Sequence, residues 1–256
     1  MNAPLMDVQD SFTVAFLGGS MFKTIIAAAM LAGAALPAAA QTYDAFSTFN
    51  GTQGAGNFTY GSWDGSNFTA FTGDTGCSNK ISDVVCLGDL PGAFATTAGA
   101  HQSGTVIVPG DALILHPGPN AGQAAAVMFT APTTADYFVD FSAFVADNNP
   151  SGVNLILFSP TFGVSQQFVT LSASNPSFSI SNYLLGPGVD APAGFQFGFA
   201  VDYDGSYYND STGIKFTVST VQDGAVPEPT SWALMVGGFG LVGGAMRRRS
   251  AKLAAA

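Results

Sequence analysis

The stretch Phe195-Gln196-Phe197-Gly198-Phe199-Ala200-Val201 alternates large apolar residues with small or polar ones. Successive side chains of a β-strand point to opposite faces of a sheet, so this stretch places three phenylalanines and a valine on one face. Ile214-Lys215-Phe216-Thr217-Val218-Ser219 repeats the pattern. We therefore interpret both stretches as strands that bury one face in a core built mainly of phenylalanine.

The same two-residue period recurs outward from these strands, and no stretch of the body has the period of an amphipathic helix. Turn signals such as Asp64-Gly65 and Asp204-Gly205 separate the apolar stretches. This spacing predicts an all-β fold, an antiparallel β-sandwich of jelly-roll type, with an immunoglobulin-like sandwich as the alternative. The other expected strands cover residues 43–49, 58–63, 68–71, 105–108, 112–115, 124–129, 137–145, 153–158, 167–171 and 178–180.

Residues 226–256 have three parts: Pro227-Glu228-Pro229, an uncharged run over residues 230–246 that contains Trp232, and the triplet Arg247, Arg248 and Arg249. The two prolines hold the first part extended and accessible to an enzyme. As a helix, the uncharged run would rise about 25 Å, slightly less than a hydrocarbon core of about 30 Å. With the arginines on the cytoplasmic side, this predicts a C-terminal transmembrane helix; a buried helix of a globular domain is the alternative.

Residues 226–249 resemble the PEP-CTERM sorting signal of exported Gram-negative bacterial proteins, in its P-E-P-x-x-W-A form. The resemblance implies export through the inner membrane and transient anchoring there by the C-terminal helix. It also implies recognition at Pro227-Glu228-Pro229 by an exosortase-type membrane protease, and delivery to the cell surface or to an exopolysaccharide matrix such as a biofilm. It implies no activity for the rest of the chain.

The N-terminal region has the features of a secretory leader from its second methionine onward. Lys23 precedes an apolar run, and Pro37-Ala38-Ala39-Ala40 ends in small residues, so we expect a signal helix over residues 21–40 and cleavage after Ala40. Residues 1–20 carry two aspartates and no basic residue. We interpret them as a mis-assigned extension, with a genuine amphipathic segment as the alternative.

Residues 41–225 then form one expected domain, long enough to bury a core of its own. This part holds fourteen aspartates, no glutamate and two lysines, a net charge of -12, which disfavours nucleic acid or an anionic membrane as a partner. Cys77 and Cys86 close a short loop, and an exported chain passes through an oxidising compartment. We expect a disulfide rather than a metal site, because neither His101 nor His116 is near them in sequence.

Catalysis is not expected, and no catalytic residue is predicted. A G-x-S-x-G nucleophile elbow is absent, the one glutamate is Glu228 of the sorting motif, and isolated histidines are typical of surfaces and turns. The clustered oxygens of Asp202, Asp204 and Asp210, like those of Asp147 and its two following asparagines, are candidate calcium ligands. Solvated turn carboxylates are the alternative, and no other cofactor is expected.

Several aromatic residues in or beside turns are candidates for sugar binding, because flat rings beside polar groups suit a glycan; core packing is the alternative. They are Tyr60, Trp63, Tyr203, Tyr207 and Tyr208. In addition, Leu113-Ile-Leu-His116-Pro117-Gly118 and Val127-Met-Phe-Thr130-Ala131-Pro132 resemble the uncharacterised sandwich domain that precedes many PEP-CTERM signals, which is similar in architecture to carbohydrate-binding modules. We expect a glycan- or matrix-binding module, with a purely structural or adhesive surface protein, lacking a specific small ligand, as the alternative.

Overall fold

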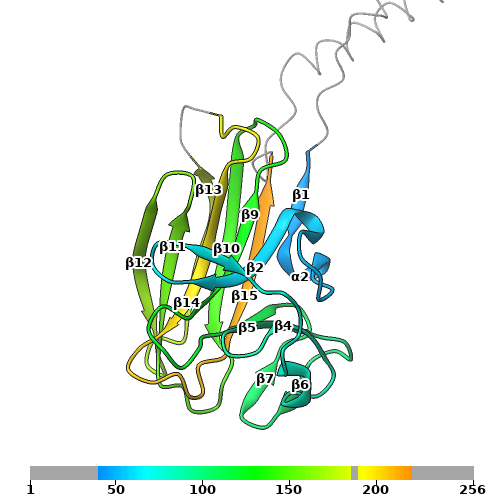
Figure 1. The fold of residues 1–256 in the computed structure, drawn as a ribbon, viewed down its shortest axis with the longest axis vertical. Coiled ribbons are helices and arrows are strands. Elements are labelled where there is room, and N and C mark those ends of the chain that lie inside the picture. Colours follow the sequence, from blue (N-terminus) through cyan, green and yellow to red (C-terminus); the bar gives the residue numbers. More distant parts are fainter. Residues whose placement is uncertain (1–39, 186–189, 221–256) are drawn as a thin grey trace, which may run out of the picture. The chain divides into compact units, whose positions relative to one another are not determined.

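The computed structural model describes residues 40–185 and 190–220 (Figure 1). The expected leader and sorting motif, with their two helices, lie outside these residues, apart from Ala40 at the expected cleavage site. Within the described ranges, no helix is long and apolar enough to cross a membrane.

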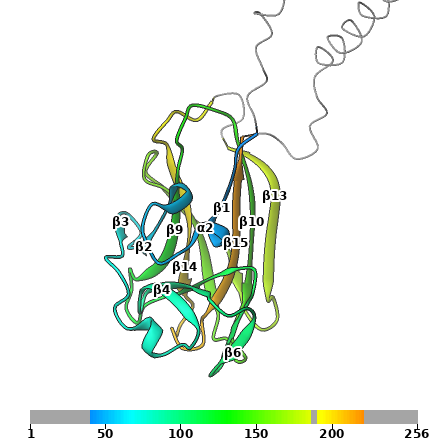
Figure 2. The same cartoon turned by 90° about the vertical axis from the view of Figure 1, so that its right-hand side faces the viewer.

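Antiparallel sheets stacked face to face make up the described part of the chain (Figures 1 and 2). The first sheet runs in the order β13 (Ser177–Leu185), β10 (Tyr137–Val145), β15 (Thr212–Ser219), β8 (Leu113–His116), β5 (Gly92–Thr96) and β4 (Val84–Gly88), with β1 (Thr42–Asp44) also on β15. The second sheet runs in the order β12 (Val164–Leu171), β11 (Val153–Ser159), β14 (Gln196–Tyr203), β9 (Ala124–Thr130), β2 (Phe58–Trp63) and β3 (Phe68–Ala70). A separate ribbon pairs β6 (His101–Ser103) with β7 (Val106–Val108).

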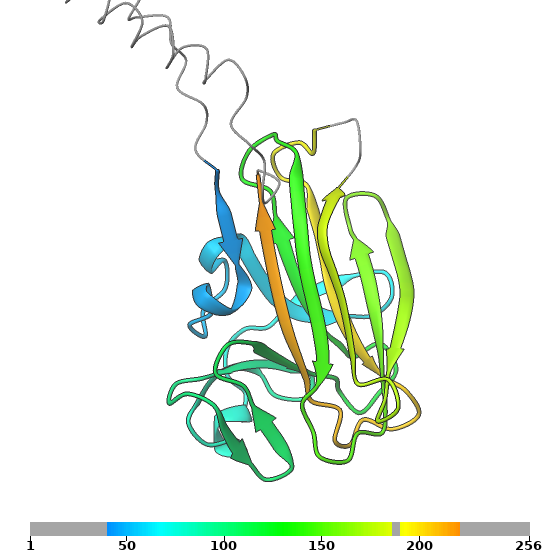
Figure 3. The ribbon, with the colours of Figure 1, turned by 180° about the vertical axis from the view of Figure 1, so that it is seen from behind.

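Eight consecutive strands, β8 to β15, have the connectivity of a jelly roll. They pair as β8 with β15, β9 with β14, β10 with β13, and β11 with β12, the pattern of one long hairpin folded over on itself. The strands before β8 widen the two sheets, β4 and β5 beside β8, β2 and β3 beside β9. The predicted antiparallel jelly-roll sandwich is confirmed (Figure 3).

The core lies between the sheets and is filled mainly by aromatic rings. Phe197, Phe199 and Phe216, from the two strands that led the sequence prediction, are each at most 3% exposed. Phe199 of the second sheet stacks on Phe141 of the first with 3.7 Å between ring centroids, and Phe216 meets Phe199 edge to face at 5.1 Å. Phenylalanine is therefore the main filler of the core, as the two-residue period predicted.

Three local features differ from the prediction. The expected strand over residues 43–49 is wrong beyond Asp44, because Asp44 accepts a hydrogen bond from the Ser47 amide at 2.6 Å and caps a one-turn helix, α2 (Ala45–Thr48). Short 3-10 turns, η1 (Ala55–Asn57) and η2 (Cys77–Asn79), were not predicted. Strands β4, β5 and β6 were also missed, since they are short and their glycines, alanines and polar residues give no clear alternation.

Candidate functional site

Strands β4 to β7 lie together at one end of the sandwich (Figure 1). Residues at this end line a cleft of about 450 Å³, which we call the end cleft. Three loops form most of the end cleft: the loop around η2, the β6–β7 loop and the β14–β15 loop. The turn between β4 and β5 and the ends of β8 and β10 complete it. Its lining residues are Cys77, Lys80, Ile81, Asp89, Leu90, Phe94, Ser103, Gly104, Thr105, Val106, His116, Asp147, Tyr207, Tyr208 and Asn209.

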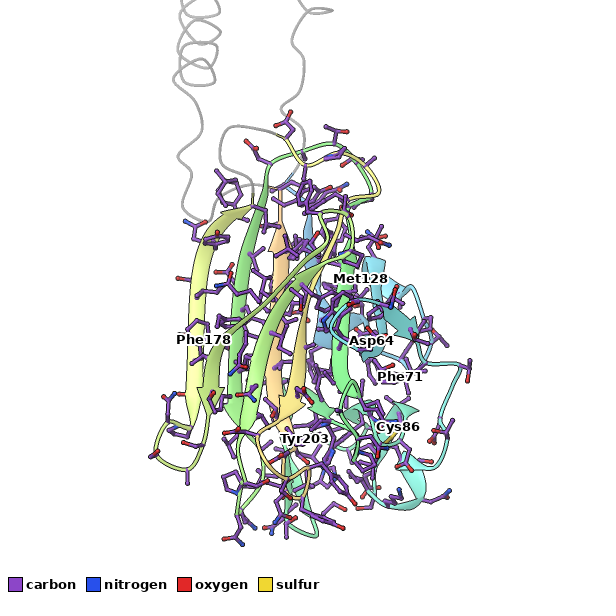
Figure 4. The ribbon with its side chains drawn as sticks, turned by 60° about the vertical axis from the view of Figure 1, so that its left-hand side comes forward. Asp64, Phe71, Cys86, Met128, Phe178 and Tyr203 are labelled. Atoms are coloured by element: carbon purple, nitrogen blue, oxygen red, sulfur yellow. A yellow bond between two sulfur atoms is a disulfide. The ribbon has the colours of Figure 1, made fainter. Side chains whose placement is uncertain are left out.

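One wall of the end cleft is held by the predicted disulfide, which is confirmed between Cys77 and Cys86, with 6.0 Å between their Cα atoms (Figure 4). The bridge joins η2 to β4. On the same wall, Lys80 Nζ lies 2.5 Å from Asp89 Oδ2. This ion pair is partly exposed to water, so it stabilises the wall by only about 0–1 kcal/mol, and the disulfide is the stronger restraint.

His116 contributes a neutral imidazole to the end cleft. Its Nδ1 lies 2.8 Å from the Pro117 carbonyl, and because a carbonyl only accepts hydrogen bonds, Nδ1 carries the proton. Burial lowers the pKa of His116, so the ring is neutral at pH 7. Its Nε2 is then a hydrogen-bond acceptor.

The opposite wall carries two adjacent tyrosines. The rings of Tyr207 and Tyr208 are 4.2 Å apart between centroids at 31°, and Tyr208 is 65% exposed. The hydrogen bond between their side chains raises the pKa of Tyr207. Ser151 Oγ lies 3.0 Å and 2.7 Å from the carbonyls of Ser206 and Tyr208, and its single proton can be donated to one of these carbonyls or to Asp210 at a time.

The structure brings only some of the predicted aromatics to this site. Tyr207 and Tyr208 lie together in the end cleft, whereas Tyr203, half-buried at the end of β14, does not line it (Figure 4). The prediction that Tyr60 is an exposed sugar-binding residue is wrong. Its ring is fully buried in the core and its hydroxyl donates to the Ala45 carbonyl at 2.9 Å, and this burial raises its pKa.

The prediction for Trp63 is also wrong, because this side chain is 3% exposed. It lies on the outer face of the second sheet, where its ring stacks on Phe158 at 4.4 Å and its Nε1 donates to Ser165 Oγ at 3.1 Å. The β2–β3 hairpin crosses in front of β11 and β14 in Figure 1, and Trp63 is the last residue of β2. Trp63 therefore covers this part of the sheet instead of offering a free ring.

The three predicted calcium ligands do not form one site. Asp204 is exposed and Asp202 half-buried, whereas Asp210 is 1% exposed and accepts hydrogen bonds from Ser151 Oγ at 2.7 Å and the Gly152 amide at 3.2 Å. Across residues 40–185 and 190–220, no group of three or more His, Cys, Asp or Glu side chains is placed to hold a metal ion.

Sequence reasoning did not assign Lys80, Asp89, His116 or Asp147 to a common site. They come from separate loops and strand ends that meet only in the folded sandwich. Asp147 is 6% exposed, and its Oδ2 accepts a hydrogen bond from the Ser211 amide at 3.1 Å. A local motif could not have revealed this grouping, because it depends on which loops lie at the same end of the fold.

Comparison with known proteins adds a distinct finding about the C-terminal segment. Residues 225–249 match the family model described as the PEP-CTERM protein-sorting motif. No curated protein matches the chain.

Among solved structures, the chain is similar to carbohydrate-binding modules of family 29. A mutant of such a module is 15% identical, covering 75% of this chain and 99% of that chain, with a TM-score of 0.32. A second structure of the family is 16% identical, covering 68% and 97%, with a TM-score of 0.30. These scores are too low to assign a shared fold or ligand. The PEP-CTERM motif at residues 225–249, in contrast, implies export, processing by an exosortase and transient membrane anchoring before display at the surface.

Proposed function

We propose that this protein works at the surface of a Gram-negative bacterium or in its exopolysaccharide matrix, where its jelly-roll body binds a glycan in the end cleft. The sorting motif supports the location. The single observation that supports the binding role is the pairing of Tyr207 and Tyr208 with polar groups in a cleft of about 450 Å³.

The chemistry of the end cleft suits a sugar. A pyranose ring has apolar C–H faces that pack on flat aromatic rings, and hydroxyls that both donate and accept hydrogen bonds. Tyr207 and Tyr208 supply the rings. The neutral His116 imidazole supplies an acceptor, and Asn209 an amide at the rim.

The charge of the body narrows the class of glycan to one without acidic groups. Both lysines of the described chain are already paired, Lys80 with Asp89 and Lys215 with Asp111. Residues 41–225 contain no arginine and have a net charge of -12. A polyuronate would be repelled by this surface, whereas a neutral polysaccharide would not.

A glycan array followed by calorimetry with the best neutral oligosaccharide tests this role, using the full chain purified in mild detergent. Tyr208→Ala should weaken binding about tenfold, which corresponds to about 1.4 kcal/mol for one lost stacking ring. Tyr183→Ala is the matched control, because Tyr183 is also more than half exposed but lies on β13, away from the end cleft. Equal loss in both variants, or no binding to any neutral glycan, would rule out the proposal.

The second candidate is a purely structural or adhesive surface protein, and one patch favours it. Phe162, Val164 and Tyr183, exposed by 69%, 43% and 54%, all line a crevice of about 270 Å³ at the edge strands β12 and β13. Adhesion of the protein to an apolar surface, lost in Phe162→Ser with Tyr183→Ser and kept in Tyr208→Ala, would favour this role.

A further inference from the structure

Three buried side-chain oxygens lie without a hydrogen-bond partner where the β10–β11 and β14–β15 loops meet. They are Asp147 Oδ1, Asp210 Oδ2 and Ser211 Oγ, on residues that are 6%, 1% and 1% exposed. In the described chain, every other buried side-chain nitrogen or oxygen has a partner. An unpaired buried carboxylate oxygen is strongly unfavourable, so this grouping needs a physical explanation.

The contacts around these residues hold them close to one another. Asp147 Oδ2 accepts from the Ser211 amide at 3.1 Å, and the Ala146 amide donates to the Ser211 carbonyl at 2.8 Å. Asp210, the residue before Ser211, is fixed by Ser151 and Gly152 through its Oδ1. Each carboxylate therefore has one oxygen tied to the protein and one left free.

The described chain offers no positive side chain to balance these two carboxylates. Lys80 and Lys215 are paired with other aspartates, and the pKa of the nearby His116 is lowered by burial, so its ring is neutral at pH 7. Two buried carboxylates without a cation beside them repel each other when both are ionised. A buried carboxylate is retained when it is paired, protonated or bound to a metal.

We propose that one calcium ion binds between these loops, with Asp147 Oδ1, Asp210 Oδ2 and Ser211 Oγ as protein ligands. The free groups are all oxygens, the donors that Ca²⁺ prefers, and they include none of the nitrogen or sulfur ligands typical of zinc. Magnesium would demand a near-ideal octahedron and would keep several waters, which suits a tightly enclosed position less well. With only two carboxylates, we expect an affinity in the range of extracellular calcium modules, a Kd of about 0.1–1 mM.

Calcium here would tie together two loops that otherwise meet through a few hydrogen bonds. In the β14–β15 loop, Asn209 alone separates Tyr208 from Asp210, so the ion would fix one wall of the end cleft. This inference does not depend on glycan binding, because it rests on the unpaired oxygens alone.

Calorimetric titration of the full chain with CaCl₂, in detergent and after removal of metals with EDTA, tests the proposal. At pH 7.5 we expect one saturable site and, at 10 mM CaCl₂, a rise of several degrees in the Tm, because an ion that binds only the folded state stabilises it. Asp210→Asn and Asp147→Asn should each weaken binding at least tenfold. Asp136→Asn is the matched control, because Asp136 is exposed at the other end of β10 and should leave calcium binding unchanged.

A second measurement on the unaltered protein covers the case in which a variant does not fold. Tb³⁺, which replaces Ca²⁺ at oxygen sites, should show luminescence sensitised by the neighbouring tyrosines, and added CaCl₂ should quench it. The absence of heat, of a Tm shift and of sensitised luminescence would overturn the proposal. Binding by magnesium alone, or binding that survives Asp210→Asn in a folded protein, would overturn it as well.

Discussion

Asp210 lies buried between two loops, and its burial raises its pKa from an ordinary value of 3.8 to about 6. Between about pH 4 and pH 6, the folded state therefore binds more protons at this group than the unfolded state does. The contribution of Asp210 to stability is thus present at low pH and is lost as the pH rises through that window. The sign is opposite to that of a carboxylate in an ion pair.

Urea unfolding in metal-free buffer at pH 5 and pH 7.5 measures this effect. Because pH 5 lies inside that window, we expect Asp210 to add about 1–1.5 kcal/mol to the free energy of unfolding at pH 5 relative to pH 7.5. The Asp210→Asn protein lacks the titrating group, so its free energy of unfolding should depend less on pH than that of the unaltered protein. The same pH dependence in both proteins would show that Asp210 is not the group responsible.

Trp63 contributes to stability and not to binding. Trp63→Ala removes a buried ring that stacks on Phe158, and we expect the free energy of unfolding to fall by about 3–5 kcal/mol. Tyr208→Ala removes an exposed ring, so it should change stability by no more than about 0.5 kcal/mol. Glycan affinity should respond in the opposite way: Tyr208→Ala should weaken binding, whereas Trp63→Ala should leave it unchanged, because Tyr208 lines the end cleft and Trp63 does not. A Trp63→Ala protein that is as stable as the original would contradict this assignment.

For the candidate aromatic residues, the sequence predicted positions in turns but did not predict burial. Tyr207 and Tyr208 were correctly expected in a loop, because glycine and aspartate mark a turn just before them. Asp64-Gly65, directly after Trp63, gave the same turn signal. However, the β2–β3 hairpin that contains this turn folds against the second sheet and buries the Trp63 ring. A turn signal predicts where the chain reverses, and burial depends on what the turn then packs against.

At the scale of elements, the disulfide is the strongest restraint on the wall that η2 and β4 form. Replacing both Cys77 and Cys86 with alanine should reduce the free energy of unfolding by about 2–3 kcal/mol, an estimate based on the entropy of closing a short loop. Urea unfolding under non-reducing conditions measures the change. Addition of a reductant should lower the stability of the original protein and leave the double variant unaffected. If the urea concentration at the unfolding midpoint were the same in the double variant as in the original protein, the disulfide would not contribute to stability.

The regular strands were predictable, and the short ones were not. Strands β14 and β15 place large apolar residues on the core face and small or polar residues on the other, so their composition alternates with a period of two residues even though β14 is buried on both faces. Strand β4 is a short apolar run without alternation, and β5 mixes glycine and alanine into both faces; β4 depends on pairing with β5, and β5 on pairing with β4 and β8. Helix α2 interrupts a strand-like composition because one aspartate side chain caps it. These features depend on strand pairing and helix capping, which cannot be read from the two-residue alternation of apolar residues in the sequence.

At the scale of the whole molecule, the sorting motif leads to a prediction about processing. The form found at the surface should begin at Gln41 and lack the apolar run over residues 230–246, because the leader and the tail are both expected to be removed. Intact-mass analysis of surface and membrane fractions checks this. A variant with alanine at Pro227, Glu228 and Pro229 should remain at full tail length in the inner membrane. A surface form that begins at Met1 or retains the arginine triplet would contradict the prediction.

Chemical-shift mapping by NMR shows directly whether a glycan binds in the end cleft. The full chain, labelled with ¹⁵N in detergent, would be titrated with the neutral oligosaccharide selected on the array. We predict that the amides that shift most belong to residues 103–106 and 207–209, which line the end cleft. Shifts concentrated instead on the outer face of the second sheet or at the β12–β13 edge, or no shifts at saturating oligosaccharide, would contradict the account.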